Sequence, residues 1–338
     1  MKIAVLGLGF MGSTHLKAYA QIPNVELVAV ASNVEKQLTG DLSDIQGNIG
    51  GPGGKMDFSA VRKYKDPMEA VKDPDVEAVD ICLPTHQHAE AALAALRAGK
   101  HVLVEKPMAL DGATADCIVE EAARSGRILM SAQVLRFIPS YRASADMLRA
   151  GTLGPVRSAI FRRRCAAPAW SQWLSDPSAS GGGAFDLLIH DIDYCIQLFG
   201  YPEAVSATGH EDLSRGVDWI LGQLHYPGIG AVAVSGGWHH PKAFPFSMEY
   251  TIVADGGTLE FNSAGVPLTL YAADGTARKF ELPDVDGYEQ EVRYFVECAS
   301  QGKKPEFCPP EQSAVAVKVT RFMVESRSTN GEKIACRF

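Results

Sequence analysis

A glycine-rich turn near the N-terminus constrains the fold of this chain more than any other feature. An apolar run over residues 1–6 leads directly into Gly7-Leu8-Gly9-Phe10-Met11-Gly12, and a helical pattern over 13–21 and a second apolar run over 25–31 follow. In this order the first glycine permits a tight turn, the second lets the backbone approach a pyrophosphate, and the third allows close packing of helix on strand. The helix N-terminus adds backbone donors and a positive dipole end. The pattern predicts a dinucleotide site that includes Gly7, Gly9, Phe10, Met11 and Gly12.

Strand and helix patterns continue to alternate through the first half of the chain. We predict strands over residues 76–83, 101–104 and 128–134, and helices over 87–98 and 111–125. Such alternation indicates parallel β-α-β crossovers, and therefore a doubly wound Rossmann domain over residues 1–135. Ligands of such sheets bind beyond the carboxyl ends of the strands. The loops there make a second set of expected cofactor-binding residues: Pro84, Thr85, His88, Glu105, Lys106 and Pro107.

The end of the second strand bears on the choice of cofactor. An acidic residue there would hold the ribose 2′-hydroxyl of NAD, whereas a small residue followed by a basic one leaves room for a 2′-phosphate. This strand ends in Ser32-Asn33, which we expect to contact the cofactor, and Lys36 follows. The site is thus predicted to take NAD or NADP, and the pattern favours NADP, although Glu35 opposes it. The glycine-rich residues 39–57 are expected to be a surface insertion beside the cofactor cleft.

Lys106 is the strongest candidate for a catalytic residue in the first half of the chain. It directly follows a predicted buried strand and precedes Pro107, so its side chain is expected to point into the cleft. A lysine there could hydrogen-bond a hydroxyl or carbonyl oxygen and stabilise charge developing on it. The alternative is an ordinary solvated lysine in a surface loop.

A second candidate site lies in the segment 181–193, where three glycines precede a helical pattern. Asp186 and His190 are four residues apart and therefore share one face of a helix. A carboxylate beside an imidazole can set the tautomer and pKa of a general base. A buried histidine satisfied by an aspartate is the alternative, and Asp193 is either a further substrate ligand or a structural carboxylate.

The second half reads as a separate α+β domain over residues 136–338. Strand patterns occur at 156–164, 203–210, 217–226, 231–238, 247–254, 258–261 and 268–272, with short connections that predict an antiparallel sheet. Helices are expected at 288–300 and 310–326, and the last is expected to pack back on the first domain. Trp170 is predicted to wall a substrate site together with Trp173, although core packing explains them equally well.

Composition excludes several classes of function. The net charge is −8 with no basic block, so no nucleic-acid partner is expected. The seven cysteines are scattered, which argues against a disulfide framework or a metal site and for a reducing, cytoplasmic location. No run of apolar residues is long enough for a membrane span, and no membrane partner is expected.

Taken together, these motifs resemble the Gfo/Idh/MocA family, the glucose–fructose oxidoreductase and inositol dehydrogenase group. The similarity rests on residues 7–12, Pro84-Thr85-His86, Glu105-Lys106-Pro107, Arg136-Phe137, residues 151–155 and residues 181–193. The resemblance implies a Rossmann domain followed by an α/β domain with a large, open, mostly antiparallel sheet. The free face of that sheet commonly forms a homodimer or homotetramer contact.

The resemblance also implies roles for individual residues. Lys106 would touch the reacting oxygen and often precedes a cis proline in such proteins, while Glu105 would border the nicotinamide. His190 would be the acid/base, and Asp186 would bind substrate and orient the imidazole. Arg136 is also expected to bind substrate.

The expected activity is hydride transfer between nicotinamide C4 and a secondary alcohol or ketone carbon of a sugar, sugar derivative or cyclitol. Two alternatives stay open: an NAD-dependent glycoside hydrolase of the same fold and a non-catalytic dinucleotide sensor. Ser32-Asn33 and the glycine-rich insertion depart from the pattern of inositol dehydrogenases and put an inositol substrate in doubt.

Overall fold

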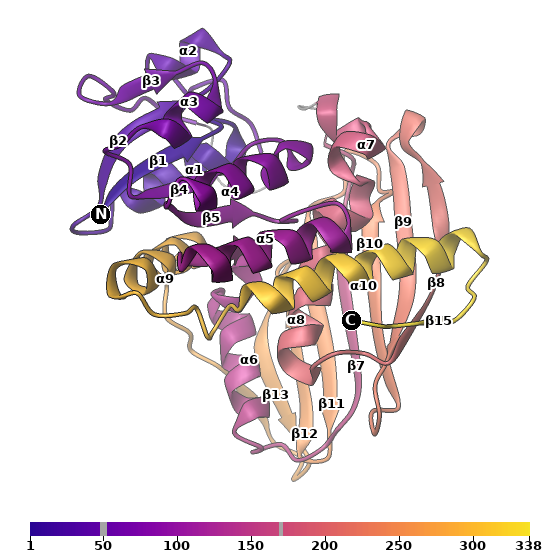
Figure 1. The fold of residues 1–338 in the computed structure, drawn as a ribbon. Helices are drawn as coiled ribbons and strands as arrows, with labels where there is room; N and C mark the ends of the chain where they lie inside the picture. Colours follow the sequence, from indigo (N-terminus) through magenta and orange to yellow (C-terminus); the bar gives the residue numbers. More distant parts are fainter. Residues whose placement is uncertain (48–52, 169–171) are drawn as a thin grey trace. The chain divides into compact units, whose positions relative to one another are not determined.

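The computed structural model describes residues 1–47, 53–168 and 172–338, and the chain divides into two compact units (Figure 1). Unit 1 comprises Met1–Val134 and Asp286–Ala314, and unit 2 comprises Leu135–Val285 and Val315–Phe338. The segment 286–314 had been expected in the second domain. It belongs to unit 1 because α9 (Gly287–Gln301) packs on α1 (Phe10–Tyr19), where Arg293 donates to the Gln21 carbonyl.

Unit 1 is built on a six-stranded, all-parallel sheet, as the alternation predicts. The strand order is β3-β2-β1-β4-β5-β6, and each neighbouring pair is parallel. The chain order reverses between β1 and β4, which makes this the switch point where doubly wound sheets bind ligands. The strands are β1 (Lys2–Leu6), β2 (Glu26–Ala31), β3 (Arg62–Tyr64), β4 (Ala78–Ile81), β5 (His101–Glu105) and β6 (Leu129–Ala132).

Helices cover this sheet, and local sequence signals set where several of them begin. Asp66 caps α3 through the Met68 amide, with a proline in the first helical position, and Asp111 caps α5 through the Thr114 amide. Besides α1 and α9, the helices of unit 1 are α2 (Glu35–Leu38), α3 (Pro67–Lys72), the short 3₁₀ turn η1 (Thr85–Gln87), α4 (His88–Arg97) and α5 (Gly112–Ser125).

Unit 2 contains a nine-stranded sheet in the order β14-β13-β12-β11-β7-β10-β9-β8-β15. Neighbouring strands are antiparallel, as the short connections predict, with the exception of the parallel pair β7 and β10. The strands are β7 (Val156–Cys165), β8 (Ala204–Asp212), β9 (Val217–His225), β10 (Ala231–Trp238), β11 (Ser247–Ala254), β12 (Gly257–Asn262), β13 (Val266–Ala272), β14 (Ala277–Lys279) and β15 (Ile334–Ala335).

One face of this sheet packs against helices (Figure 1). Tyr141 of α6 and Tyr194 of α8 meet Phe161 and Tyr250 of the sheet in a buried aromatic cluster. The Tyr194 hydroxyl donates to the Tyr141 carbonyl at 2.7 Å, so burial of this ring leaves its polar atom satisfied. The helical elements of unit 2 are η2 (Val134–Arg136), α6 (Pro139–Arg149), η3 (Gln172–Ser175), α7 (Pro177–Ser180), a π turn (Ala184–Leu188), α8 (Ile189–Phe199), η5 (Leu213–Arg215) and α10 (Pro310–Ser328), whose first five residues belong to unit 1.

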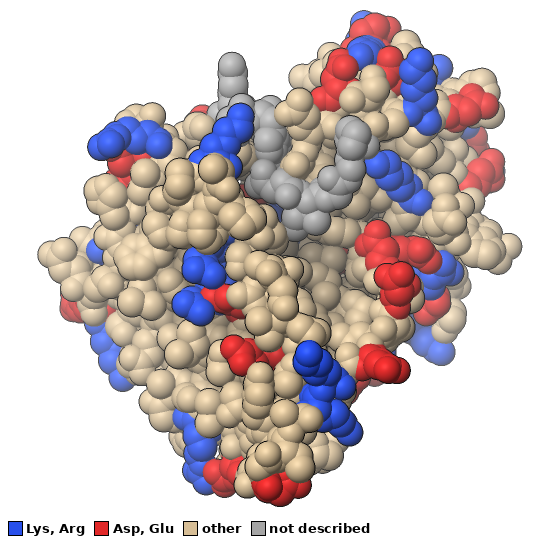
Figure 2. Space-filling model, turned by 180° about the vertical axis from the view of Figure 1, so that it is seen from behind, with Lys and Arg blue, Asp and Glu red and all other residues tan. Residues whose placement is uncertain are grey.

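The opposite face of the sheet carries exposed apolar side chains. Ile160, Leu221 and Tyr271 expose 49%, 46% and 45% of their surface. The surface seen from behind is largely neither acidic nor basic, interrupted by small groups of charged side chains (Figure 2). In the part of the chain that the structure describes, we find no helix with the length and apolar character that crossing a bilayer requires.

Candidate cofactor and active site

The glycine-rich turn has the geometry that dinucleotide binding requires. Gly7 has a φ of +91°, a region that side chains with a Cβ rarely adopt. A Cβ on Gly12 would lie 1.9 Å from the Gly7 carbonyl oxygen, so only glycine lets α1 pack this close to the turn. A Cβ on Gly9 would meet nothing within 4 Å, which leaves open space over the start of α1. The first amides of a helix have no partner within the helix, so those of α1 can bind a pyrophosphate.

Three loops meet at the carboxyl edge of the sheet beside this turn. The backbone of Gly7 lies against the carbonyl of Cys82, which follows β4, and Lys106 follows the neighbouring strand β5. Pro84 precedes η1, in which Thr85 is buried. The structure therefore brings the predicted residues after β1, β4 and β5 to one edge of unit 1.

Hydrogen bonds hold the main chain at Lys106 and at Pro107, the residue that follows it. The Lys106 amide donates to Oε2 of Glu105 at 3.0 Å, and the Lys106–Pro107 peptide is cis, in agreement with the resemblance. His88 is 1% exposed, with Nδ1 2.8 Å from the Pro107 carbonyl oxygen and Nε2 2.7 Å from that of Leu83. Because both ring nitrogens of His88 lie at backbone carbonyl oxygens, this side chain holds the loop in place, and its expected contact with the cofactor stays a prediction.

A buried cluster of titratable side chains adjoins Glu105, and the sequence analysis did not predict it. His15 of α1 donates from Nδ1 to Oδ2 of Asp80 at 2.8 Å, and its Nε2 lies 3.2 Å from Oε1 of Glu105. The thiol of Cys82 lies 3.5 Å from the same Nδ1. We call these four residues the His15 cluster. The available signal was Asp80, a charged residue in an otherwise apolar strand.

The His15 cluster also contains the one described group with metal-ligand spacing: one ligand atom each from His15, Asp80 and Cys82 lies within 4.8 Å of the others. The cluster does not suit a metal ion. Nδ1 of His15 is engaged by Asp80, and burial raises the pKa of the Cys82 thiol, which opposes the thiolate that binds metals.

The end of β2 presents no carboxylate, as the sequence indicates. Ser32 is 7% exposed, and its hydroxyl donates to Gln37 and accepts from the Val34 amide. Lys36, the residue expected to favour a 2′-phosphate, forms ion pairs with Asp44 and Asp41 of the insertion. A 2′-phosphate would therefore compete with two carboxylates for this ammonium.

The insertion lies beside the glycine-rich turn. A Cβ on Gly47 would fall 2.1 Å from ring carbons of Phe10, so the backbone of the insertion packs directly on this ring. Asp41 and Lys55 form an isolated β-bridge across the insertion, and residues 48–52 lie outside the described part of the chain.

In unit 2, Asp186 and His190 lie in a helical segment that is otherwise buried. Between residues 182 and 196 they are the two partly exposed side chains, and all the others are buried. The sequence pattern predicted a continuous α-helix, but Asp186 lies in the π turn and His190 in the first turn of α8. π turns are rare and occur often at functional sites.

The start of the π turn is anchored to the sheet. The Ala184 amide donates to Oδ2 of Asp218 in β9 at 3.2 Å, and Arg327 of α10 pairs with the same carboxylate. A Cβ on Gly182 would lie 2.4 Å from that oxygen, which explains why the turn begins with glycine. The glycines thus bring the segment close to β9 and fix the positions of the residues that follow.

Two buried ion pairs fix α8 itself. Arg136 makes two hydrogen bonds to Asp193, both 2.8 Å long, and Arg163 binds Asp191 in the same way at 2.9 and 3.1 Å. Arg136 is 1% exposed. Its burial and its bidentate partner show that Arg136 holds α8 through Asp193, and the expected contact of Arg136 with substrate stays a prediction.

An apolar wall borders this segment. Cys165, Leu174, Leu187 and Trp238 form a buried cluster, against which Trp173 packs. Burial and, to a smaller extent, the nearby charge of Asp186 raise the pKa of the Cys165 thiol to about 12, so Asp186 lies close to this wall. Trp170, predicted to bind substrate, lies outside the described residues.

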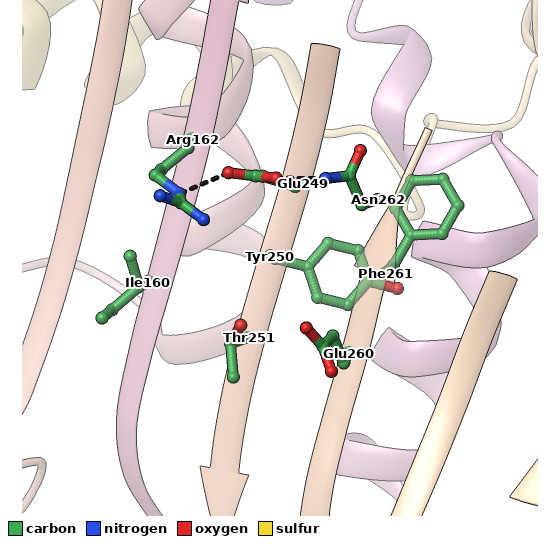
Figure 3. Close-up of a pocket in the computed structure, with 8 residues that line it drawn as sticks. All are labelled: Ile160, Arg162, Glu249, Tyr250, Thr251, Glu260, Phe261 and Asn262. Carbon is green, nitrogen blue, oxygen red and sulfur yellow. Dashed lines mark hydrogen bonds and ion pairs between the residues drawn. The ribbon is translucent and has the colours of Figure 1, made fainter. Parts of the chain in front are cut away.

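A separate hollow of about 320 Å³ lies on the open sheet face, lined by β7, β11 and β12 (Figure 3). Glu249 lies between Arg162 and Asn262 and binds both, with Arg164 adjoining. Glu249, Arg162 and Asn262 already pair with one another, and none of the predicted site residues lines this hollow. The remaining lining residues are Ile160, Tyr250, Thr251, Glu260 and Phe261.

Comparison with known proteins agrees with this layout. The sequence model described as "Oxidoreductase family, NAD-binding Rossmann fold" matches residues 1–133, and the GFO/IDH/MocA C-terminal domain matches residues 141–260. The chain is 30% identical to myo-inositol 2-dehydrogenase of Thermotoga maritima over 62% of its own length, which spans only 58% of that protein. It is 27% identical to scyllo-inositol 2-dehydrogenase (NAD(+)) of Bacillus subtilis, over 90% of this chain and 88% of the relative.

The fold is also that of solved structures. Levoglucosan dehydrogenase in complex with NADH and levoglucosan superposes with a TM-score of 0.85, at 19% sequence identity and over 99% of both chains. The motifs, the two kinds of sheet and the two matching domain models lead to one conclusion: the chain belongs to the Gfo/Idh/MocA family of oxidoreductases, with an NAD-binding Rossmann fold.

Proposed function

We propose that this protein moves a hydride between nicotinamide C4 and a secondary alcohol or ketone carbon of a sugar, sugar derivative or cyclitol. The observation that carries the proposal is the placement of Asp186 and His190 as the accessible pair in an otherwise buried segment. An imidazole beside a carboxylate, with one side open, is what a general base needs. The names of the relatives, inositol and levoglucosan dehydrogenases, support a polyhydroxylated substrate.

The residues of the chain divide the chemistry between them. His190 takes the hydroxyl proton as the carbon–hydrogen bond breaks and the carbonyl forms, and Asp186 orients the imidazole and binds a neighbouring hydroxyl. Lys106 donates a hydrogen bond to the reacting oxygen and stabilises its alkoxide-like charge. The bound nicotinamide supplies the hydride acceptor. The glycine-rich turn holds the pyrophosphate, for which the open space at Gly9 is fitted.

A panel of sugars and cyclitols, assayed with NAD and NADP separately by the absorbance of the reduced cofactor, tests this function. Stoichiometric cofactor reduction is expected with at least one compound. Lys106→Ala and His190→Ala are expected to lose at least about a hundredfold in turnover while still binding cofactor. The exposed residues Lys304 and His210 provide matched controls. Cleavage of a glycoside without net reduction would refute the proposal in favour of a hydrolase.

The finer cofactor choice follows from Lys36. We keep the preference for NADP as part of the proposal, because no carboxylate follows β2, and Lys36 would exchange Asp44 for the 2′-phosphate.

The seven cysteines are all free thiols, which supports the proposed reducing, cytoplasmic location.

The open face of the nine-stranded sheet supports a homodimer or homotetramer. Ile160 is exposed on β7, the central strand, and Leu221 is exposed on β9, two strands further along the sheet. Light scattering should give a mass of at least two chains, and Ile160→Asp with Leu221→Asp should lower it. A wild-type monomer would overturn this part of the proposal.

A further inference from the structure

The His15 cluster contacts the backbone of Lys106 through Glu105, although the proposed reaction gives the cluster no role. His15 and Asp80 are fully buried, and Glu105 is 5% exposed. The side chains come from three neighbouring elements: α1, which follows the glycine-rich turn, and the carboxyl-terminal ends of β4 and β5. The cluster therefore joins the cofactor turn to β5, the strand that directly precedes Lys106.

The contacts form a continuous chain that ends at the Lys106 backbone. Asp80 binds Nδ1 of His15, Nε2 of His15 pairs with Oε1 of Glu105, and Oε2 of Glu105 accepts the Lys106 amide. Each oxygen of Glu105 thus has its own partner. With carboxylates at both ring nitrogens, an imidazolium suits the arrangement, because a neutral ring carries a proton on only one nitrogen.

We propose that His15, as a buried imidazolium, is a positioning residue that fixes Glu105 and thereby the main chain at Lys106. The inference rests on the proposed function, since Lys106 is the group that is positioned. A buried carboxylate without a cationic partner is costly, so loss of the proton from His15 would displace Glu105 and release the Lys106 amide.

The charged state has support in the surroundings. Burial alone would lower the pKa of His15, but the Asp80 carboxylate and its hydrogen bond, with a smaller contribution from Cys82, raise it well above its usual 6.5. The titratable groups that face the cluster from the packed elements are Asp80 and Cys82 from β4 and its end, Glu105 from β5, Tyr19 from α1 itself and, beyond Tyr19, Glu291 from α9.

Asp80→Asn tests the proposal, because it removes the charge that keeps the proton on His15. The ratio of its kcat to that of wild type is expected to fall at least tenfold between pH 5 and pH 9, while the Kd of NAD changes less than threefold. Asp73→Asn is the matched control. Asp73 is a buried carboxylate of the same unit, bound by Arg62 and Tyr64, and it precedes β4 at the opposite end of the strand.

A merely structural role would lower the melting temperature and reduce kcat equally at every pH. A constant ratio in Asp80→Asn, or the same fall in Asp73→Asn, would therefore overturn the proposal. A loss of NAD binding equal to the loss of kcat would also overturn it, because His15 would then act on the dinucleotide turn.

A measurement on the wild-type protein does not depend on whether the variants fold. In ¹⁵N-histidine NMR spectra at pH 8, the ring of His15 should carry protons on both nitrogens, and a neutral tautomer would overturn the proposal. Lys106→Ala is assayed in parallel to separate the two claims. If it keeps full turnover, the proposed function fails; if it loses turnover while Asp80→Asn follows the wild-type pH profile, only the positioning role fails.

Discussion

Replacing two glycines of the same turn by alanine is expected to have different effects: Gly12→Ala should lower stability, and Gly9→Ala should weaken cofactor binding. A Cβ on Gly12 would lie 1.9 Å from the Gly7 carbonyl oxygen, whereas real Cβ contacts essentially never fall below 3.0 Å. Helix and turn would have to separate by at least about 1.1 Å, the difference between these distances. Because both partners are backbone, no rotamer relieves the clash, so we expect the upper end of overpacking costs, about 3 kcal/mol.

Gly9→Ala should instead leave the fold intact. Gly9 has φ −74° and ψ −157°, which alanine adopts, and its Cβ would meet nothing in the protein. That Cβ would project into the space where the pyrophosphate approaches. We therefore expect a loss of stability of about 0.5 kcal/mol and at least tenfold weaker binding of NADH, which corresponds to about 1.4 kcal/mol.

Thermal unfolding and a fluorescence titration with NADH separate the two effects. Gly12→Ala should lower the melting temperature by about 6–12 °C, given about 2–4 °C per kcal/mol for a unit of this size. Gly9→Ala should lower it by about 2 °C or less. Gly54→Ala is the control, since its Cβ also meets nothing. Wild-type affinity in Gly9→Ala, or wild-type stability in Gly12→Ala, would refute the geometric reasoning.

Three further predictions concern the cofactor, the buried ion pairs and pH. Lys36→Ala should lower kcat/KM for NADP about tenfold, with little change in kcat/KM for NAD. Asp44→Asn should raise the ratio of kcat/KM for NADP to that for NAD, because Asp44 binds the Lys36 ammonium. Steady-state kinetics with both cofactors measure this ratio, and an unchanged ratio in both variants would show that Lys36 does not bind the 2′-phosphate. Asp193→Ala should destabilise unit 2 by about 3–5 kcal/mol, because it removes the bidentate carboxylate partner of the buried Arg136. Asp146→Ala, which breaks the exposed pair with Arg149, should cost less than about 0.5 kcal/mol, and equal melting temperatures would contradict the distinction. Because the pKa of His15 is raised in the folded state, its stabilising contribution is complete below the unfolded pKa of about 6.5 and is lost as pH rises through the folded pKa. The melting temperature should therefore fall more steeply between pH 6 and pH 9 for wild type than for His15→Gln. Parallel curves for the two proteins would contradict this prediction.

The parts of the structure that follow from local sequence were predictable. The glycine-rich turn between a strand and a helix has a backbone requirement at each glycine, and the alternation that follows leaves little choice but a parallel sheet. The antiparallel character of the second sheet follows equally from short connections. The cis peptide before Pro107 came from the family resemblance and not from spacing.

Contacts between residues far apart in sequence could not be predicted in the same way. The substrate role of Arg136 came from the family resemblance, whereas its pairing with Asp193, 57 residues away, left no local signal in the sequence. Helix α9 joins unit 1 because its apolar face packs on α1, which lies at the other end of the chain. The π turn escaped prediction because a spacing of four residues suits an α-helix equally well.

The central claim is that Lys106 and His190 act on the same substrate hydroxyl at the nicotinamide. A crystal structure of the protein with NAD(P)H and a polyol identified in the substrate panel tests it most directly. Nζ of Lys106 and a ring nitrogen of His190 should each lie about 2.6–3.2 Å from the reacting oxygen, whose carbon faces C4 of the nicotinamide. A complex in which either side chain is directed away from that oxygen would contradict the account.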